Sequence, residues 1–207
     1  MAAFLGNLRN VVIVSFILAI IFIAAYYSVH GAGPDELVWQ AIFRWLHVIF
    51  GVMWIGLLWY FNFVQTRMMP QIPADLRPAI SKYIAPEALF WFRWGALFTW
   101  IMGVILAWSR GFLLQAYSLG AYEPGGAAFS NRGHILIGVG MWLATIMFIN
   151  VWALIWPNQK KVLGLVEADD AAKASAGRIA GQASRINTLL SIPMLVAMTM
   201  HQTLIQG

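Results

Sequence analysis

About five stretches of roughly twenty mostly apolar residues run through this chain. Apolar side chains make up 61% of the 207 residues and charged ones only 10%, more apolar surface than a soluble core of this size can bury. A helix that crosses the hydrocarbon core of a bilayer needs roughly 20 such residues. The sequence therefore predicts an all-α integral membrane bundle, one domain over residues 1–207, with helices at about 10–30, 38–63, 88–109, 133–156 and 186–204.

Basic residues in the connections predict the orientation of these helices, because cytoplasmic loops retain Lys and Arg. With the N-terminus inside, nine Lys and Arg residues fall on the inner side and only Arg110 and Arg132 on the outer side. We therefore expect a multi-pass protein of the inner, cytoplasmic membrane, surrounded by lipid, with its N-terminus cytoplasmic and its C-terminus periplasmic. The net charge of +5 is spread over loops without an aromatic and basic groove, so no nucleic acid is expected.

Three connections have patterns of their own. Residues 69–87 carry several prolines among apolar residues at helical spacing, which predicts a short helix in the membrane interface. Residues 160–185 are rich in Ala and charged residues and predict a solvated amphipathic helix. On the outer side, residues 111–131 are long enough to form a lid over an exterior pocket.

All four histidines lie toward the outer side of the predicted spans. His47 is roughly nine residues into its helix, about 13 Å below the boundary. His134 opens the fourth span, and His201 lies near the outer end of the fifth. His30 ends the first span and is interpreted as an ordinary interfacial residue. Ionisable side chains inside a bilayer are costly and commonly functional, so the first three are candidate site residues.

Two of these histidines stand one turn above a glycine on the same helix face. Gly51 follows His47 by four residues, and Gly138 follows His134 at the same spacing. A flat macrocycle against a helix backbone requires such small neighbours. Arg44, one turn nearer the surface than His47, is placed to meet a haem propionate.

Other interpretations of the histidines remain open. They are also consistent with imidazoles that simply hydrogen-bond between packed helices. A metal without porphyrin is a third possibility, because His47, His134 and His201 together offer three imidazoles for copper or zinc. The chain has no cysteine, which excludes disulfides, Cys-ligated metal centres and a c-type haem attachment within it.

Longer motifs resemble the N-terminal membrane domain of the bacterial membrane-bound urate oxidase (urate hydroxylase) family. The likeness runs from about residue 38 to the end, and the matching strings occur in family order. They are R-W-L-H at 44–47 with Gly51 and W-I-G at 54–56, W-F-R-W at 91–94, F-T-W at 98–100, N-V-W at 150–152, W-P-N-Q-K-K at 156–161, and Asn187, Pro193 and His201.

The resemblance implies oxidation of urate to 5-hydroxyisourate, with electrons passed to a c-type cytochrome that is commonly fused behind the membrane part. Since these residues contain no cysteine, we expect the acceptor to be a separate c-type cytochrome or a larger membrane complex. The predicted site is a haem b near the periplasmic face. His47 and His134 are its expected axial ligands, Arg44, Gly51 and Gly138 surround it, and His201 is an alternative ligand or a catalytic proton-transfer group. The alternative function is a cofactor-free structural or accessory subunit of a larger membrane complex.

Overall fold

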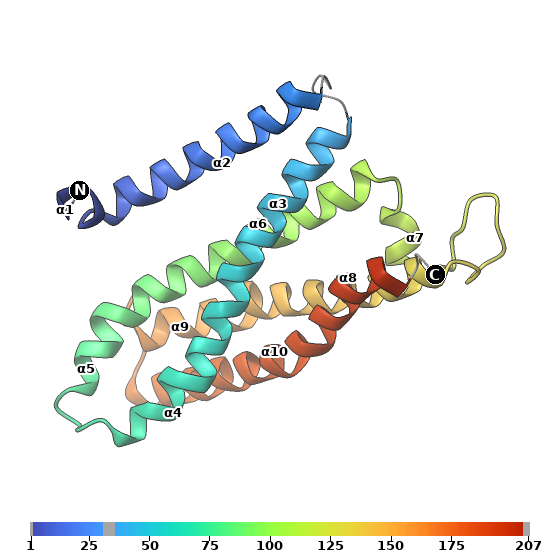
Figure 1. The fold of residues 1–207 in the computed structure, drawn as a ribbon. Helices are drawn as coiled ribbons and strands as arrows, with labels where there is room; N and C mark the ends of the chain where they lie inside the picture. Colours follow the sequence, from blue (N-terminus) through green and yellow to red (C-terminus); the bar gives the residue numbers. More distant parts are fainter. Residues whose placement is uncertain (1, 31–35, 205–207) are drawn as a thin grey trace. The chain divides into compact units, whose positions relative to one another are not determined.

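The structure is a computed structural model that describes residues 2–30 and 36–204, with residues 2, 3, 29, 30, 202 and 204 described by their backbone alone. The described chain is helical and contains no strand, so the predicted all-α fold is confirmed (Figure 1). Its α-helices are α1 (Ala2–Leu5), α2 (Leu8–His30), α3 (Glu36–Trp59), α4 (Thr66–Met68), α5 (Arg77–Ala79), α6 (Ala85–Ser109), α7 (Leu113–Tyr117), α8 (Arg132–Ile149), α9 (Trp156–Val162) and α10 (Asp170–Leu204). Short π and 3₁₀ segments are η1 (Tyr60–Gln65), η2 (Met69–Gln71), η3 (Ile80–Ile84) and η4 (Asn150–Ile155).

The chain divides into two compact units, residues 1–41 and 42–207. The first contains α1, α2 and the first turns of α3, and the side chains of α2 are largely exposed and apolar. The second is a bundle of α3, α6, α8 and α10. Figure 1 shows α4 and α5 at one end of this bundle and α7 at the other.

Four helical segments of the described chain are long and apolar enough to cross a membrane, which supports a multi-pass membrane protein. They are Leu8–Ser28, Glu36–Gln71, Arg77–Ser109 and Arg132–Val162. The fifth predicted span, 186–204, forms the second half of α10. This segment is less apolar because it carries polar side chains such as Asn187 and Ser191, both fully buried in the bundle.

Two predicted separate helices are instead continuous with the spans beside them. Residues 77–84 lead directly into α6, and residues 170–185 form the first half of the 35-residue α10. Pro78 does not interrupt the first of these, because it stands in the first turn, where proline is tolerated. Pro86 directly follows the π segment η3, and the helix continues through it. The predicted solvated helix is only half solvated, since Ala176, Ala180 and Ala183 are buried.

Polar contacts tie α10 to its neighbours inside the apolar core. Asn187 donates through Nδ2 to the Met147 carbonyl oxygen at 2.9 Å and accepts from Asn150 Nδ2 at 2.9 Å. Ser191 Oγ accepts from Trp59 Nε1 at 3.0 Å. In lipid such bonds contribute about 0.6 kcal/mol each on average, so the network selects the register of the helices more than it stabilises the bundle.

Candidate functional site

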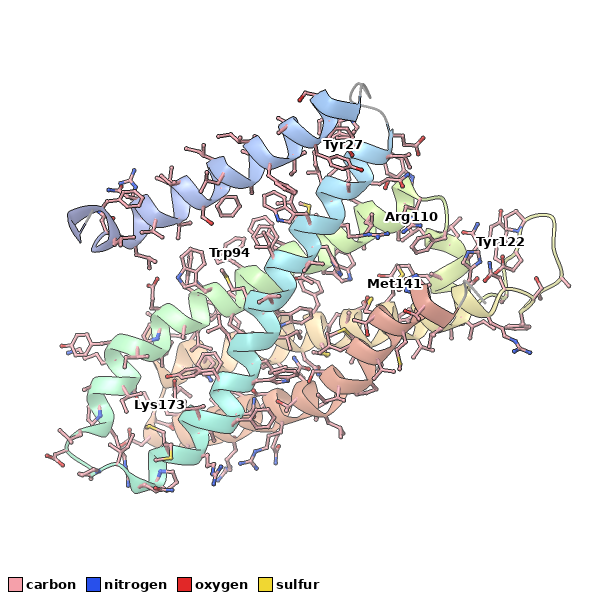
Figure 2. The ribbon with its side chains drawn as sticks, in the orientation of Figure 1. Tyr27, Trp94, Arg110, Tyr122, Met141 and Lys173 are labelled. Carbon is pink, nitrogen blue, oxygen red and sulfur yellow. The ribbon has the colours of Figure 1, made fainter. Side chains whose placement is uncertain are left out.

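A cavity of 690 Å³ lies in the second unit and is lined by side chains of α3, α6, α7, α8 and α10. We call it the central cavity. Its volume falls in the range of about 300 to 1,000 Å³ that holds small ligands and cofactors. Most of its lining is apolar, and its polar groups are few. Figure 2 labels two of the lining residues, Arg110 at the C-terminal end of α6 and Met141 on α8.

His47 enters the central cavity from α3 with one ring nitrogen already bound. Its Nδ1 lies 2.8 Å from the carbonyl oxygen of Thr99 on α6. A carbonyl oxygen only accepts, so Nδ1 carries the proton and Nε2 keeps a free lone pair. Metal-ligating histidines usually have this arrangement, in which a backbone carbonyl fixes the tautomer and the ring orientation.

Gly103 of α6 makes room for the His47 ring. A Cβ at this position would lie 2.8 Å from His47 Cε1 and 2.9 Å from Nδ1, closer than such atoms approach. The imidazole therefore packs directly on bare helix backbone, and the Gly103 backbone is part of the same wall of the cavity.

His201 lines the same cavity from α10, and its Nδ1 also lies at a backbone carbonyl oxygen. Its Nδ1 lies 3.3 Å from the carbonyl oxygen of Met198, one turn earlier. Neither His47 Nε2 nor His201 Nε2 has a hydrogen-bond partner among the described residues. Two imidazoles from different helices thus offer lone pairs to one cavity.

Two arginines give the histidine end of the cavity its charge. Arg44 on α3 and Arg110 after α6 both line the cavity, and their charges act on one another and on His201. No Asp or Glu of the described chain lines it, and neither guanidinium has an ion pair within that part of the chain. An uncompensated pair of guanidinium groups favours an anionic group such as a carboxylate.

The structure places His134 outside the central cavity, with both ring nitrogens engaged. Nδ1 contacts the carboxylate of Glu123 at 2.7 Å, and Nε2 lies 3.4 Å from Nδ2 of Asn131, the residue that caps α8. Its ring stacks on Phe112 at 6.2 Å between centroids. His134 therefore ties the loop at 111–131 to α8 and has no free lone pair for the ligand role that the sequence predicted.

The two predicted glycines have different surroundings. Gly51 lines the central cavity, and a Cβ there would meet only Thr99 Cγ2 at 3.6 Å, an ordinary contact. Gly138 packs instead against α7, where a Cβ would collide with the carbonyl group of Ala116. The small residue beside His134 thus permits a close helix contact and leaves no space for a macrocycle.

Of the predicted site residues, the structure brings together Arg44, His47, Gly51 and His201 and leaves His134 and Gly138 apart. The described residues contain no group of three His, Asp or Glu side chains able to hold a metal ion, so His47, His134 and His201 do not form one cluster. The side chain of His30 lies outside the described residues.

Sequence reasoning missed Arg110 and Gly103. Arg110 had a visible signal, because it is one of only two basic residues on the predicted outer side. Gly103 had no signal in the sequence, because its contact with the His47 ring depends on how α3 packs against α6.

The residues of the central cavity fit the predicted haem b. Two imidazole nitrogens without hydrogen-bond partners among the described residues suit iron ligation, and apolar walls suit the macrocycle. Two arginines without an ion pair in the described chain, of which Arg110 also lies over the Phe112 ring, suit the propionates. Of the expected ligands, His47 and the alternative ligand His201 line the cavity, and His134 does not.

Fold and site together define a polytopic helical membrane protein with a cationic, histidine-bearing cavity. Residues 112–205, from the last residue before α7 through α10, match the family model described as urate oxidase N-terminal. The resemblance to membrane-bound urate oxidase predicted from the sequence is thereby confirmed over residues 112–205. No curated protein and no solved structure matches the chain.

Proposed function

We propose that this protein is a membrane oxidoreductase of the urate hydroxylase type, with a haem b in the central cavity. The observation that carries the proposal is the presence of His47 and His201 in one cavity. Their Nδ1 atoms both lie at backbone carbonyls, and neither Nε2 atom has a hydrogen-bond partner in the described part of the chain. The family match of residues 112–205 supports the reaction class. When bound, the haem would supply one-electron redox chemistry that no side chain of the cavity provides.

The residues of the chain have distinct parts in this function. His47 and His201 would hold the iron from two helices. Arg44 and Arg110 would bind the propionates and keep positive charge beside the centre. The apolar walls from α3, α6 and α8 exclude bulk water, which strengthens the electrostatic effect of both guanidinium groups. Urate is an anion, and the same positive end of the cavity would favour its approach.

The spectrum of the purified protein tests the cofactor. A Soret band and a reduced α band are expected, and His47→Ala and His201→Ala should each lose most of them. His134→Ala is the matched control and should keep the spectrum, because its ring lies outside the cavity. A colourless, folded preparation would favour the structural subunit instead. Loss of haem in His47→Ala and His134→Ala, with haem retained in His201→Ala, would restore the ligand pair predicted from the sequence.

Urate turnover tests the reaction. Haem-loaded protein in nanodiscs should consume urate, followed by its ultraviolet absorbance, when an electron acceptor is supplied. His201→Ala and Arg44→Gln should slow this consumption. A haem-loaded protein that leaves urate unchanged with every acceptor would show that the cavity serves a different substrate.

A further inference from the structure

Two motifs of the sequence contact each other outside the central cavity. W-F-R-W at 91–94 belongs to α6, and W-P-N-Q-K-K at 156–161 forms most of α9. The Arg93 guanidinium lies over the ring of Trp156, 4.0 Å from its centroid. Neither residue lines the cavity, so the proposed function gives them no part.

A second cation lies against the same indole. Lys160 Nζ is 5.9 Å from the centroid of the Trp156 ring. Arg93 is in addition 5.1 Å from the centroid of Phe90. The side chains of Arg93, Trp156 and Lys160 are all partly exposed, so a ligand can reach them. We call these three residues the cationic site.

No carboxylate of the described chain neutralises the two cations. Neither Arg93 nor Lys160 has an ion pair among the described residues. The carboxylate of Glu87, which is also on α6, accepts a hydrogen bond from Trp91 Nε1 instead. Residues 1–34, which include α1 and α2, contain no Asp or Glu, so these helices cannot supply a counter-charge in any position. Aromatic faces attract cations but leave their net charge in place, and the site therefore favours an anion.

The length of the helices puts the site at a boundary of the membrane. Trp156 lies about 36 Å along α8 and η4 from Arg132, at 1.5 Å per residue. The hydrocarbon core of a bilayer is about 30 Å thick. A span that enters hydrocarbon near Arg132 thus leaves it shortly before Trp156, and Lys160 follows one turn further out. This end of the bundle has most of the Lys and Arg residues and is the end predicted to be cytoplasmic, where anionic lipids are abundant.

From these features we propose that the cationic site binds the headgroup of an anionic phospholipid. The Arg93 guanidinium and the Lys160 ammonium bind the phosphate, and the Trp156 indole keeps both cations at the membrane boundary. A phosphocholine headgroup brings a third cation to the site and is the poorer ligand. The bound lipid links α6 to α9 and stabilises the bundle at this end. The inference depends on neither haem nor urate.

Photolabelling locates the lipid. The full chain in a non-ionic detergent receives phosphatidylglycerol with a diazirine on its headgroup, and the labelled peptides are mapped after irradiation. Label is expected on residues 90–94 and 156–161. Unlabelled phosphatidylglycerol should compete for the site, and phosphatidylcholine should not. Equal competition by both lipids, or label confined to other peptides, would overturn the proposal.

Variants of single cations test which side chains bind the headgroup. Arg93→Gln and Lys160→Gln should each reduce labelling about tenfold or more, because each removes one charge-assisted contact. Lys161→Gln is the matched control, since it removes the same charge from the next residue, which is exposed. Equal labelling of Arg93→Gln and Lys161→Gln would contradict the site.

The conservative variant Arg93→Lys separates binding from packing. It should keep most of the label, because an ammonium group also binds phosphate. Circular dichroism of each variant measures its helix content. A loss in Arg93→Lys as complete as in Arg93→Gln, at equal helix content, would show that Arg93 only stacks on Trp156 and would overturn its role as a phosphate ligand.

Native mass spectrometry distinguishes a lipid from a free anion. Wild type and Arg44→Gln should each retain one phosphatidylglycerol in detergent, and Arg93→Gln should lose it. Loss in Arg44→Gln instead would place the lipid at the central cavity and overturn the proposal. Millimolar inorganic phosphate should not displace the lipid, because phosphate has no acyl chains. Displacement by phosphate, with phosphate bound in its place, would overturn the lipid and identify a soluble anion as the ligand.

Discussion

The His47 ring rests on the bare backbone of Gly103, and this contact fixes where its free Nε2 points. A methyl group at residue 103 would lie within 3 Å of two ring atoms, while the bond from Nδ1 to Thr99 holds the ring in place. The ring must then rotate or lose that bond. A single glycine of α6 thus positions a ligand that belongs to α3.

Gly103→Ala should therefore impair cofactor binding without unfolding the protein. We expect a reduced ratio of Soret to protein absorbance, with a melting temperature close to wild type. Gly51→Ala is the matched control, because its Cβ meets Thr99 Cγ2 at an ordinary 3.6 Å. Equal haem content in the two variants would show that His47 does not need the space at residue 103.

Removing the charge of either cavity arginine should lower the midpoint potential of the haem. Arg44→Gln and Arg110→Gln each remove a positive charge beside the cavity, which stabilises the oxidised state and should lower the midpoint potential. A unit charge near the centre contributes on the order of 1 kcal/mol through protein, equivalent to tens of millivolts. Arg93→Gln should leave the potential unchanged in the same redox titration, because Arg93 lies outside the cavity lining and stacks on Trp156 at 4.0 Å.

At the scale of elements, close helix contacts hold the α7 end of the bundle together. Gly138 lets α8 approach the carbonyl of Ala116 in α7, and Gly140 lets the same helix approach Ala197 of α10, where a Cβ would lie 3.1 Å from the alanine Cβ. Small residues at such crossings allow backbones to pack tightly in membranes. Gly138 and Gly140 therefore hold α8 close to α7 and α10, although neither glycine lines the cavity.

Gly138→Ala should destabilise the fold by about 1 to 3 kcal/mol, the usual cost of overpacking. Thermal unfolding followed by circular dichroism would show a lower melting temperature. Gly181→Ala in α10 is the control, since nothing lies within 4 Å of its Cβ position, and a better helix former there should be neutral or stabilising. Equal melting temperatures would argue against the contact between α7 and α8.

For the whole molecule, the distribution of basic residues predicts the orientation in the membrane. Figure 2 shows Arg110 and Tyr122 at one end of the second unit and Lys173 at the other. The Lys173 end has most of the Lys and Arg residues and is therefore expected to be cytoplasmic. The Arg110 end of the central cavity is then expected on the periplasmic side.

Reporter fusions test this orientation. A reporter after Gly207 should be active outside the cytoplasm, and one inserted in the exposed turn at 163–169, between α9 and α10, should be active inside. Both reporters on one side would mean that α10 does not cross the membrane. That result would also place His201 and the charged end of the cavity on the cytoplasmic side.

Much of the fold could be predicted from the sequence because each helix that crosses lipid requires a long run of apolar residues. Apolar length alone indicated the helices and the membrane, since a buried polar backbone must bond within its own segment. The ends of the helices were less predictable. Pro78 and Pro86 resemble helix breaks in the sequence, yet Pro78 stands in a first turn and the helix continues through Pro86 after the π segment η3. The alanines before residue 185 continue α10 because they pack in the bundle.

The sequence by itself determined the membrane class and the family resemblance, and it identified Arg44, His47 and His201 as candidate site residues. Which histidines share a cavity was decided by tertiary structure alone. His47 and His134 have the same spacing to a glycine, but Gly51 faces open space and Gly138 faces the Ala116 carbonyl. Periodicity assigns a residue to a face of its own helix, and only the packing of neighbouring helices decides whether that face meets a cavity or a backbone.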